Sequence, residues 1–233
     1  MYQVLEQINK GLVVSCQALE GEPLHSSFIM GRMAIAAKEG GAVGIRANSV
    51  SDIIEIKKQV SLPVIGIIKK VYGDHPVFIT PTMQEIAALA KTGAEIIATD
   101  ATNRIRPDGS DLQSFYQEVR RAYPHILLMA DVSTVKEAIF ADELGFDIVA
   151  PTLYGYTEET KGLKIDDYDY AVIKQIIKEV KNAKVIAEGN VLTPEIACSL
   201  LEMNVDAVVV GGAITRPQII TKRFVDAMQK KLN

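Results

Sequence analysis

The sequence predicts a (β/α)8 barrel, which is a closed ring of eight parallel strands with a helix after each strand. Three observations support this. Eight short runs rich in β-branched residues alternate with segments whose apolar residues have helical spacing. The strand runs are almost continuously apolar, as strands are when helices cover a parallel sheet on both faces. Glycine or asparagine separates several helices from the next strand, at the position where a helix ends in a left-handed residue.

The expected strands and helices follow one another in regular order. The strands are predicted at Leu12–Gln17, Val43–Arg46, Val64–Ile68, Ile96–Thr99, Ile126–Ala130, Ile148–Ala150, Val185–Glu188 and Ala207–Val210. The helices are predicted at Ile29–Lys38, Val50–Gln59, Met83–Lys91, Leu112–Ala122, Val135–Leu144, Tyr170–Val180, Pro194–Met203 and Pro217–Lys230. A length of 233 residues suits one barrel, and no linker rich in Pro, Ser or Gly divides the chain. We therefore expect a single domain over residues 1–233.

Helix boundaries carry the residues that start and end helices. Thr193-Pro194-Glu195 and Ser133-Thr134 provide capping hydroxyls, and the first also has an early proline. Two long connections, Lys69–Pro81 and Tyr154–Asp169, follow strands on the face where barrel loops tend to be functional. The first contains Val77–Thr80, a candidate for a short extra strand.

Composition argues against several classes of partner. The formal net charge is −4 and no block of like charges occurs, so we expect no binding to nucleic acid or to a membrane surface. Cys16 and Cys198 are isolated, which is typical of a reduced, cytoplasmic protein. Residues Met1–Lys10 lack the apolar run of a signal peptide, and no stretch reaches the roughly 18 apolar residues of a membrane span.

Metal and nucleotide motifs are also missing from the sequence. The three histidines are scattered and have no metal-ligand spacing, so we expect no metal. Gly211-Gly212 is not part of a G-x-G-x-x-G motif, and no P-loop lysine follows it. These patterns indicate neither a nicotinamide cofactor nor ATP.

Two glycine turns near the C-terminus suggest a site for a phosphate group. V-I-A-E-G-N (Val185–Asn190) and V-V-V-G-G-A-I-T-R-P (Val208–Pro217) each end an apolar strand at glycine and lead into a helix. Such turns let backbone N–H groups approach an anion, and barrels commonly bind phosphate after strands 7 and 8. We expect the phosphate-binding residues to be Gly189, Asn190, Gly211, Gly212 and Arg216. Arg216 can equally make a surface contact at the start of the last helix.

The ends of the other strands supply candidate catalytic and substrate-binding groups. In a barrel these ends converge on one site, and charged groups there are costly unless they are paired or used. The candidates are Gln17, Arg46, Lys69 or Lys70, Asp131, Thr152 and Glu188. A role outside the chemistry stays open for four of these positions: Arg46 in an ion pair, Asp131 as a helix cap through Ser133, one of the two lysines in solvent, and Glu188 on a solvated face.

Taken together, these segments resemble the N-acetylmannosamine-6-phosphate 2-epimerase family, over nearly the whole chain. The matching segments are V-S-C-Q-A-L-E-G-E-P-L (Val14–Leu24), G-I-R-A-N (Gly44–Asn48), P-V-I-G-I-I-K (Pro63–Lys69), I-T-P-T (Ile79–Thr82), M-A-D-V-S-T (Met129–Thr134), G-Y-T (Gly155–Thr157), A-E-G-N (Ala187–Asn190) and G-G-A-I-T-R-P (Gly211–Pro217). One departure is Tyr154, where the family pattern has a small polar residue.

The resemblance implies an isomerase of amino-sugar and sialic acid breakdown that inverts C2 of a sugar phosphate without a cofactor. It also implies that Lys69, rather than Lys70, is catalytic and that Glu188 is its partner. Gln17, Arg46 and Asp131 would line the sugar site. We expect a small-molecule sugar phosphate as ligand and a homo-oligomer, with a dimer favoured. The last helix carries apolar residues at helical spacing, which fit packing on a partner and equally fit covering its own barrel.

Other kinds of protein remain as alternatives. An epimerase of the ribulose-phosphate type would need metal-binding histidines at strand ends, and the sequence has none there. A Schiff-base aldolase could use Lys69. A sensor that binds a sugar phosphate without turnover, or a scaffolding barrel, would not need both Lys69 and Glu188.

Overall fold

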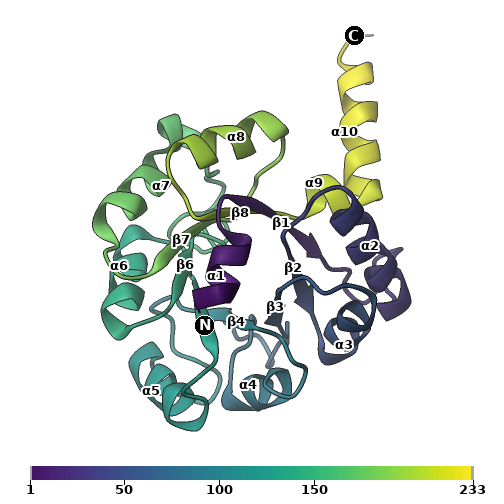
Figure 1. Ribbon diagram of the computed structural model, residues 1–233. Helices are drawn as coiled ribbons and strands as arrows, with labels where there is room; N and C mark the ends of the chain where they lie inside the picture. The colour runs from purple at the N-terminus through teal and green to yellow at the C-terminus, as the bar shows by residue number, and fades with distance from the viewer. Residues whose placement is uncertain (1, 232–233) are drawn as a thin grey trace.

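The computed structural model describes residues 2–231. Residues 1, 232 and 233 of the predicted 1–233 domain lie outside the described residues. Eight parallel strands pair in sequence order, and β8 pairs back with β1 to close a barrel (Figure 1). The predicted (β/α)8 fold is therefore confirmed.

The strands and helices have the following bounds. The strands are β1 Gly11–Cys16, β2 Gly44–Asn48, β3 Val64–Ile67, β4 Ile96–Asp100, β5 Leu127–Asp131, β6 Ile148–Ala150, β7 Lys184–Ala187 and β8 Ala207–Val210. The helices are α1 Tyr2–Ile8, α2 Ser27–Glu39, α3 Val50–Gln59, α4 Met83–Leu89, α5 Leu112–Ala122, α6 Val135–Leu144, α7 Asp167–Glu179, α8 Pro194–Glu202, α9 Gly212–Thr215 and α10 Pro217–Gln229.

Each predicted strand overlaps an observed one, and the differences lie in the connections. The sequence analysis did not predict α1 or α9. Tyr168, Asp169 and Tyr170 have φ values of 52, 57 and 60°, so the regular part of α7 follows Tyr170. The Val77–Thr80 segment makes a single antiparallel bridge, between Ile79 and Lys69, instead of a strand.

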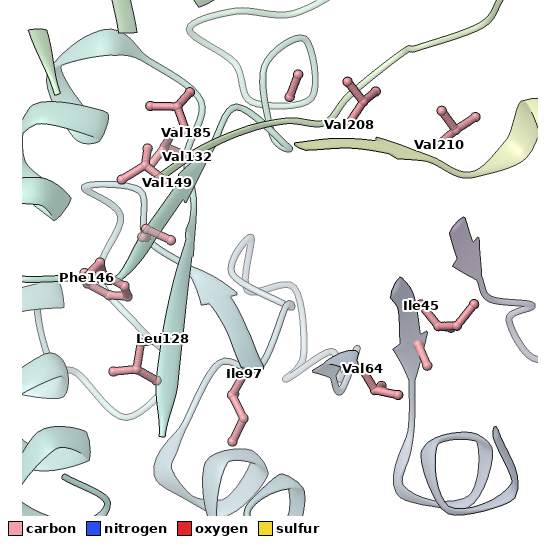
Figure 2. Packing of buried hydrophobic residues seen from close by; sticks show 14 of the residues in the cluster. Ile45, Val64, Ile97, Leu128, Val132, Phe146, Val149, Val185, Val208 and Val210 are labelled. Atoms are coloured by element: carbon pink, nitrogen blue, oxygen red, sulfur yellow. The ribbon is translucent and has the colours of Figure 1, made fainter. Parts of the chain in front are cut away.

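Alternation along the strands produces two apolar layers. Side chains such as Val13, Ile65, Met129, Ile186 and Val209 fill the barrel interior. The intervening residues face the helices, and Figure 2 shows Ile45, Val64, Ile97, Leu128 and Val149 on successive strands of this outer layer. Both faces of the sheet are thus buried, which explains the continuous apolar runs in the sequence.

The same alternation sends particular residues into the barrel mouth. Arg46 is the interior residue of β2 between outward-facing Ile45 and Ala47. Lys69 follows interior Ile67, and Glu188 follows interior Ile186 by the same two-residue step. The polar strand ends therefore converge on one face of the barrel.

Helix caps resolve one alternative from the sequence. Thr134 caps α6 by accepting a hydrogen bond from the Glu137 backbone N–H, and Glu137 completes a capping box. Asp131 does not cap this helix, because its carboxylate binds Arg46 instead. The capping role considered for Asp131 is therefore wrong.

The C-terminal helix α10 projects away from the barrel (Figure 1). None of its described residues is buried. No helix between residues 2 and 231 is long and apolar enough to cross a membrane.

Candidate active site

A pocket of about 550 Å³ opens at the mouth of the barrel, at the carboxyl ends of the strands. It is lined by residues from β1 and β8 and from the loops after β1, β3, β6, β7 and β8. Those with polar side chains or at the glycine turns are Ser15, Gln17, Lys69, Thr152, Tyr156, Glu188, Gly189, Asn190, Gly211, Gly212 and Arg216. The two glycine turns and the two predicted catalytic residues therefore face one cavity.

Arg46 does not itself line this pocket but provides a charged floor next to it, because it contacts Glu188, which does line the pocket. Its guanidinium is 1% exposed and donates to both carboxylate oxygens of Asp131, at 3.0 and 2.6 Å. It also donates to Glu188 Oε2 at 2.7 Å. Burial disfavours the charged guanidinium, but the facing carboxylates of Asp131 and Glu188 outweigh that cost and raise the pKa of Arg46. The ion-pairing role considered for Arg46 is thus present, and one of its partners is a predicted catalytic residue.

Glu188 is positioned to hold or release a proton near neutral pH. Burial raises its pKa to about 7, and the negative charge of Asp131 adds to that effect. The Arg46 and Lys69 cations oppose the shift but do not cancel it. An acid with a pKa near the working pH is suited to general acid–base chemistry.

Lys69 is the matching basic group. Burial lowers its pKa to about 8, helped by the nearby charges of Arg46 and Arg216. The backbone N–H of Lys69 donates to Asn48 Oδ1 at 2.7 Å, which fixes the end of β3 against β2. Among the described residues Lys69 has no carboxylate within 4.0 Å of its amine.

Lys70 lies outside the pocket, as one of the two lysines was expected to. Its amine pairs with Glu85 at 3.2 Å and lies 4.7 Å from the centre of the Tyr72 ring. The side chain is 46% exposed. In the sequence, only the family resemblance favoured Lys69 over Lys70. The structure gives the physical reason, because side chains alternate along β3 and Lys69 continues the series that faces the barrel interior.

Two buried polar atoms in this region lack a hydrogen-bond partner in the described structure. They are Oε1 of Gln17, whose Nε2 donates to Ser15 Oγ at 2.7 Å, and Nε of Arg46. Leaving such an atom unpaired costs about 1–3 kcal/mol, so both are suited to bonding a substrate. Thr152 donates to Asp131 Oδ1 at 2.6 Å and thereby helps to orient the carboxylate that holds Arg46.

The turn after β7 requires glycine. Gly189 has a φ of +114°, and a Cβ at this position would lie 3.0 Å from the Pro151 carbonyl oxygen. A side chain would therefore be both strained and crowded. The adjacent Asn190 is also left-handed, with a φ of +53°, and accepts a hydrogen bond from the Tyr156 hydroxyl at 3.0 Å. The predicted phosphate residues after β7 lie in the pocket together.

The turn after β8 has a charged neighbour. Arg216 Nη1 lies 3.9 Å from the place of a Cβ on Gly212, so the guanidinium borders the glycine pair. Arg216 also pairs with Glu22, with Nε at 2.8 Å from the carboxylate, and this ties the loop after β1 to the loop after β8. The cation is therefore held at the pocket and is not a free surface side chain.

Several residues at the site were not predicted as site residues. Glu22 lies within the motif Val14–Leu24, but no periodicity marks it as the partner of Arg216. Phe78 and Ile79 line the pocket from the long loop after β3, and Tyr156 does so from the loop after β6. The sequence signals that these loops contribute to the site were their length and, for Ile79 and Tyr156, the family-like motifs I-T-P-T and G-Y-T.

The arrangement suits proton transfer on a small anionic molecule. A carboxyl group and an amine whose pKa values lie near neutrality share a cavity with two glycine turns, and a buried cation pairs with the carboxyl group. Within residues 2–231, no three His, Cys, Asp or Glu side chains gather as a set of metal ligands.

Comparisons with known proteins agree over most of the chain. The family described as "NanE: Putative N-acetylmannosamine-6-phosphate epimerase" matches residues 30–230. A protein of Borrelia garinii subsp. bavariensis named "Putative N-acetylmannosamine-6-phosphate 2-epimerase" is 56% identical over 227 residues, which cover 97% of this chain and 98% of that protein. A protein of the same name from Listeria innocua is 52% identical over the same share of each chain.

A solved structure supports the same relationship. The N-acetylmannosamine-6-phosphate 2-epimerase of Clostridium perfringens superposes with a TM-score of 0.90 and is 50% identical in sequence. The similarity covers 96% of this chain and 95% of that one.

Proposed function

We propose, because the chain belongs to the N-acetylmannosamine-6-phosphate 2-epimerase family, that it interconverts N-acetylmannosamine 6-phosphate and N-acetylglucosamine 6-phosphate in amino-sugar and sialic acid breakdown. It is an isomerase of the racemase and epimerase class. The single observation that carries the proposal is the shared cavity of Lys69, Glu188 and the two glycine turns. These residues supply an acid–base pair and an anion cradle within one small volume.

The chemistry begins from the open-chain aldehyde form of the sugar. Its C2 hydrogen lies next to the carbonyl group, so removal of that proton gives an enolate. Return of a proton to the opposite face inverts C2, and no electron is gained or lost. The reaction therefore needs two proton-transfer groups, one on each face of C2, and no redox cofactor.

Lys69 and Glu188 are the proposed catalytic groups. In one direction the neutral amine removes the proton and the carboxylic acid returns one; in the other direction the carboxylate removes it and the ammonium returns one. In both directions the active form of the enzyme carries one proton in total on Lys69 and Glu188. A lysine pKa of about 8 and a glutamate pKa of about 7 make that state abundant between these values.

Arg46 is the proposed stabiliser of the enolate. Its Nε is buried without a partner in the described structure, and its two Nη atoms are fixed by carboxylates. A fixed donor aimed at developing negative charge is worth about 3 kcal/mol of barrier reduction. Asp131 holds the guanidinium in place, and Thr152 holds Asp131. Gln17 is proposed to bind the sugar through its unpaired Oε1 or the adjoining amide.

The phosphate group is proposed to bind at the two glycine turns. Gly189, Asn190, Gly211 and Gly212 line the pocket with backbone that no bulky side chain covers, and Arg216 contributes a positive charge next to them. Binding energy from this remote group would hold C2 between the amine and the carboxyl group.

The direct test is turnover of N-acetylmannosamine 6-phosphate in D2O, followed by NMR. We expect N-acetylglucosamine 6-phosphate with deuterium at C2. Lys69→Ala and Glu188→Ala should each lose most of kcat while circular dichroism stays unchanged. Product that keeps all of its original C2 hydrogen would exclude exchange with solvent and with it the proposed mechanism.

We also propose that two copies of the chain form a dimer by packing the α10 helix of each on the barrel of the other. An apolar groove of about 310 Å³ lies over the outer face of β1 and β8, lined by Leu12, Ala197, Leu201, Val208 and Val210 among others. This is where the last helix of a closed barrel would pack. Instead, α10 points away from its own barrel.

The sequence of α10 supports this exchange. Ile220, Phe224 and Met228 recur every four residues and form one apolar stripe, with Phe224 68% and Met228 65% exposed. Light scattering should give the mass of a dimer, and Phe224→Lys should give a monomer. The neighbouring surface variant Arg223→Lys should stay dimeric. A monomeric wild-type chain at micromolar concentration would contradict this part of the proposal.

A cytoplasmic location and a single domain over residues 1–233 stay proposals. The location is supported by two free cysteines, Cys16 and Cys198, which suit a reducing compartment. The single domain is supported by the barrel strands, which run from residue 11 to residue 210 with a helix or a long loop between each pair.

A further inference from the structure

The loop between β3 and α4 turns back and covers one side of Lys69. Phe78 and Ile79 of this loop line the pocket beside the lysine. Ile79 forms an antiparallel bridge with Lys69, and the Thr80 backbone N–H donates to the Ile68 carbonyl at 2.7 Å. The wall next to the lysine is therefore a short stretch of chain folded against the end of β3.

Thr80, at the end of this wall, has a strained backbone conformation that its surroundings must stabilise. It is fully buried and has a φ of +46°, which is unusual for a β-branched residue. Such a backbone costs roughly 1–3 kcal/mol and persists only where the surroundings fix it. Its hydroxyl accepts from the Ile68 N–H at 3.2 Å, and its carbonyl accepts from Thr99 Oγ1 at 2.9 Å.

Arg106 makes the other contacts that fix Thr80 and the neighbouring Pro81. Its side chain, from the loop after β4, is 2% exposed and donates to the carbonyl oxygens of Thr80 at 3.5 Å and Pro81 at 2.9 Å. It also donates to Thr99 Oγ1 at 3.2 Å and to the Asp100 carbonyl, and it stacks 3.6 Å from the centre of the Phe115 ring.

No carboxylate in residues 2–231 forms an ion pair with Arg106, because the Asp100 carboxylate pairs with Arg104 at 2.7 Å. A buried cation without a paired carboxylate is costly, and the charges of Asp100 and Asp108 offset only part of that cost, since burial lowers the pKa of Arg106 to about 10. Arg106 does not line the pocket and both of its Nη atoms donate to protein groups, so contact with a ligand does not account for its burial.

We propose that Arg106 is a positioning residue for the reaction: by clamping Thr80 and Pro81 it keeps Phe78 and Ile79 against Lys69 and keeps water away from the lysine amine. The inference rests on the proposed function for the catalytic role of Lys69, whereas the clamp itself is a property of the loop. Loss of the clamp opens the wall and hydrates the amine.

Hydration of Lys69 changes when it ionises. Burial is the largest cause of its lowered pKa. The charged groups that face it are Arg46 and Arg216, which lower the pKa, and Glu188 and Asp131, which raise it. Glu22 is a further charged group close enough to interact with Lys69. None of these five groups lies in the clamp, so release of the clamp raises the lysine pKa toward its ordinary value.

The test measures the ionisation of Lys69 directly. Competitive labelling with acetic anhydride, read by mass spectrometry of the Lys69 peptide across pH, gives the lysine pKa from the shape of the titration. Three variants are compared with the wild type: Arg106→Gln, Thr99→Val and Arg120→Gln. Thr99→Val removes a donor to the Thr80 carbonyl without a change of charge. Arg120 is the matched control, because it also lies over an aromatic ring, that of Tyr116, and donates to a backbone carbonyl but lies away from the pocket.

We expect Arg106→Gln to raise the Lys69 pKa by about one unit, which is about a tenfold drop in neutral amine below that pKa. Thr99→Val should shift it in the same direction by less, and Arg120→Gln should leave it unchanged. The alkaline limb of kcat/KM should move with the labelled pKa. If Arg106→Gln does not fold, the Lys69 pKa of Thr99→Val tests the proposal.

Two results would overturn the clamp: folded Arg106 and Thr99 variants with a wild-type Lys69 pKa, or an equal shift in Arg120→Gln. A wild-type chain that titrates as expected but does not epimerise the sugar phosphate would reject the proposed function and leave the clamp standing.

Discussion

Removing the charge of Asp131 should move the pH optimum of the enzyme toward acid. The active form carries one proton shared between Lys69 and Glu188, so activity should fall below a pH of about 7 and above about 8 in the wild type. Asp131 raises the pKa of both groups through its negative charge. In Asp131→Asn, both the Glu188 carboxyl group and the Lys69 ammonium group lose their protons at lower pH. The acid and alkaline limbs of the pH–activity profile therefore both shift to lower pH.

The size of the shift follows from the geometry. Asp131 Oδ1 and Glu188 Oε2 accept from the same Arg46 nitrogen, at 3.0 and 2.7 Å, so these oxygens lie within about 6 Å of each other. Two unit charges at that distance interact by about 3 kcal/mol at an effective dielectric constant of about 20, or about two pKa units. We expect the acid limb to move by between about one and two units, and the Lys69 limb by less, because Lys69 forms no ion pair with Asp131.

The assay is kcat/KM for N-acetylmannosamine 6-phosphate across the neutral pH range. Asp142→Asn is the control, because Asp142 is a buried carboxylate that binds backbone N–H groups of residues 181–183, outside the pocket. It should lower stability and leave the optimum in place. A folded Asp131→Asn enzyme whose optimum is unmoved, or moves toward alkaline pH, would refute the shared-proton reasoning.

Two further substitutions test the cradle and the charged floor. Gly189→Ala should lower kcat/KM by roughly 100-fold, mainly through KM, because the new Cβ crowds the Pro151 carbonyl and shifts the turn. Gly41→Ala is the matched control, because Gly41 also has a positive φ but a Cβ there would have nothing within 4 Å. Equal losses in both variants would count against a phosphate site. Arg46→Met should destabilise the protein by about 3–5 kcal/mol in urea unfolding, because it leaves two carboxylates without their cation. Without the opposing Arg46 cation, Glu188 would ionise only at still higher pH, so stability should fall as pH rises through its raised pKa, and a loss that does not shrink on acidification would argue against this cause.

The repeating part of the fold could be predicted from the sequence because it follows from local patterns. Continuous apolar runs mark strands that are buried on both faces, and the positions of Arg46, Lys69 and Glu188 at strand ends follow from the two-residue alternation. The convergence of these strand ends was predicted on this basis; in the structure Lys69 and Glu188 line one pocket, and Arg46 pairs with Glu188 beside it.

What the sequence could not predict depends on contacts between loops. The direction of α10 cannot be derived from its spacing, since an apolar stripe fits its own barrel as well as a partner. Arg106 stands in a polar segment that resembles an ordinary turn, and its burial comes from carbonyl groups of a loop 25 residues earlier. The ion pair between Arg216 and Glu22 joins residues 194 positions apart, with no pattern that links them.

The account depends most on Lys69 and Glu188 reaching C2 from opposite faces, and single variants in D2O test this directly. In Glu188→Gln, Lys69 should still exchange the C2 hydrogen of one epimer with solvent, without inversion. In Lys69→Met, Glu188 should exchange the C2 hydrogen of the other epimer only. Loss of all exchange in one variant, together with epimerisation in both directions by the other, would show that a single group serves both faces and would contradict the account.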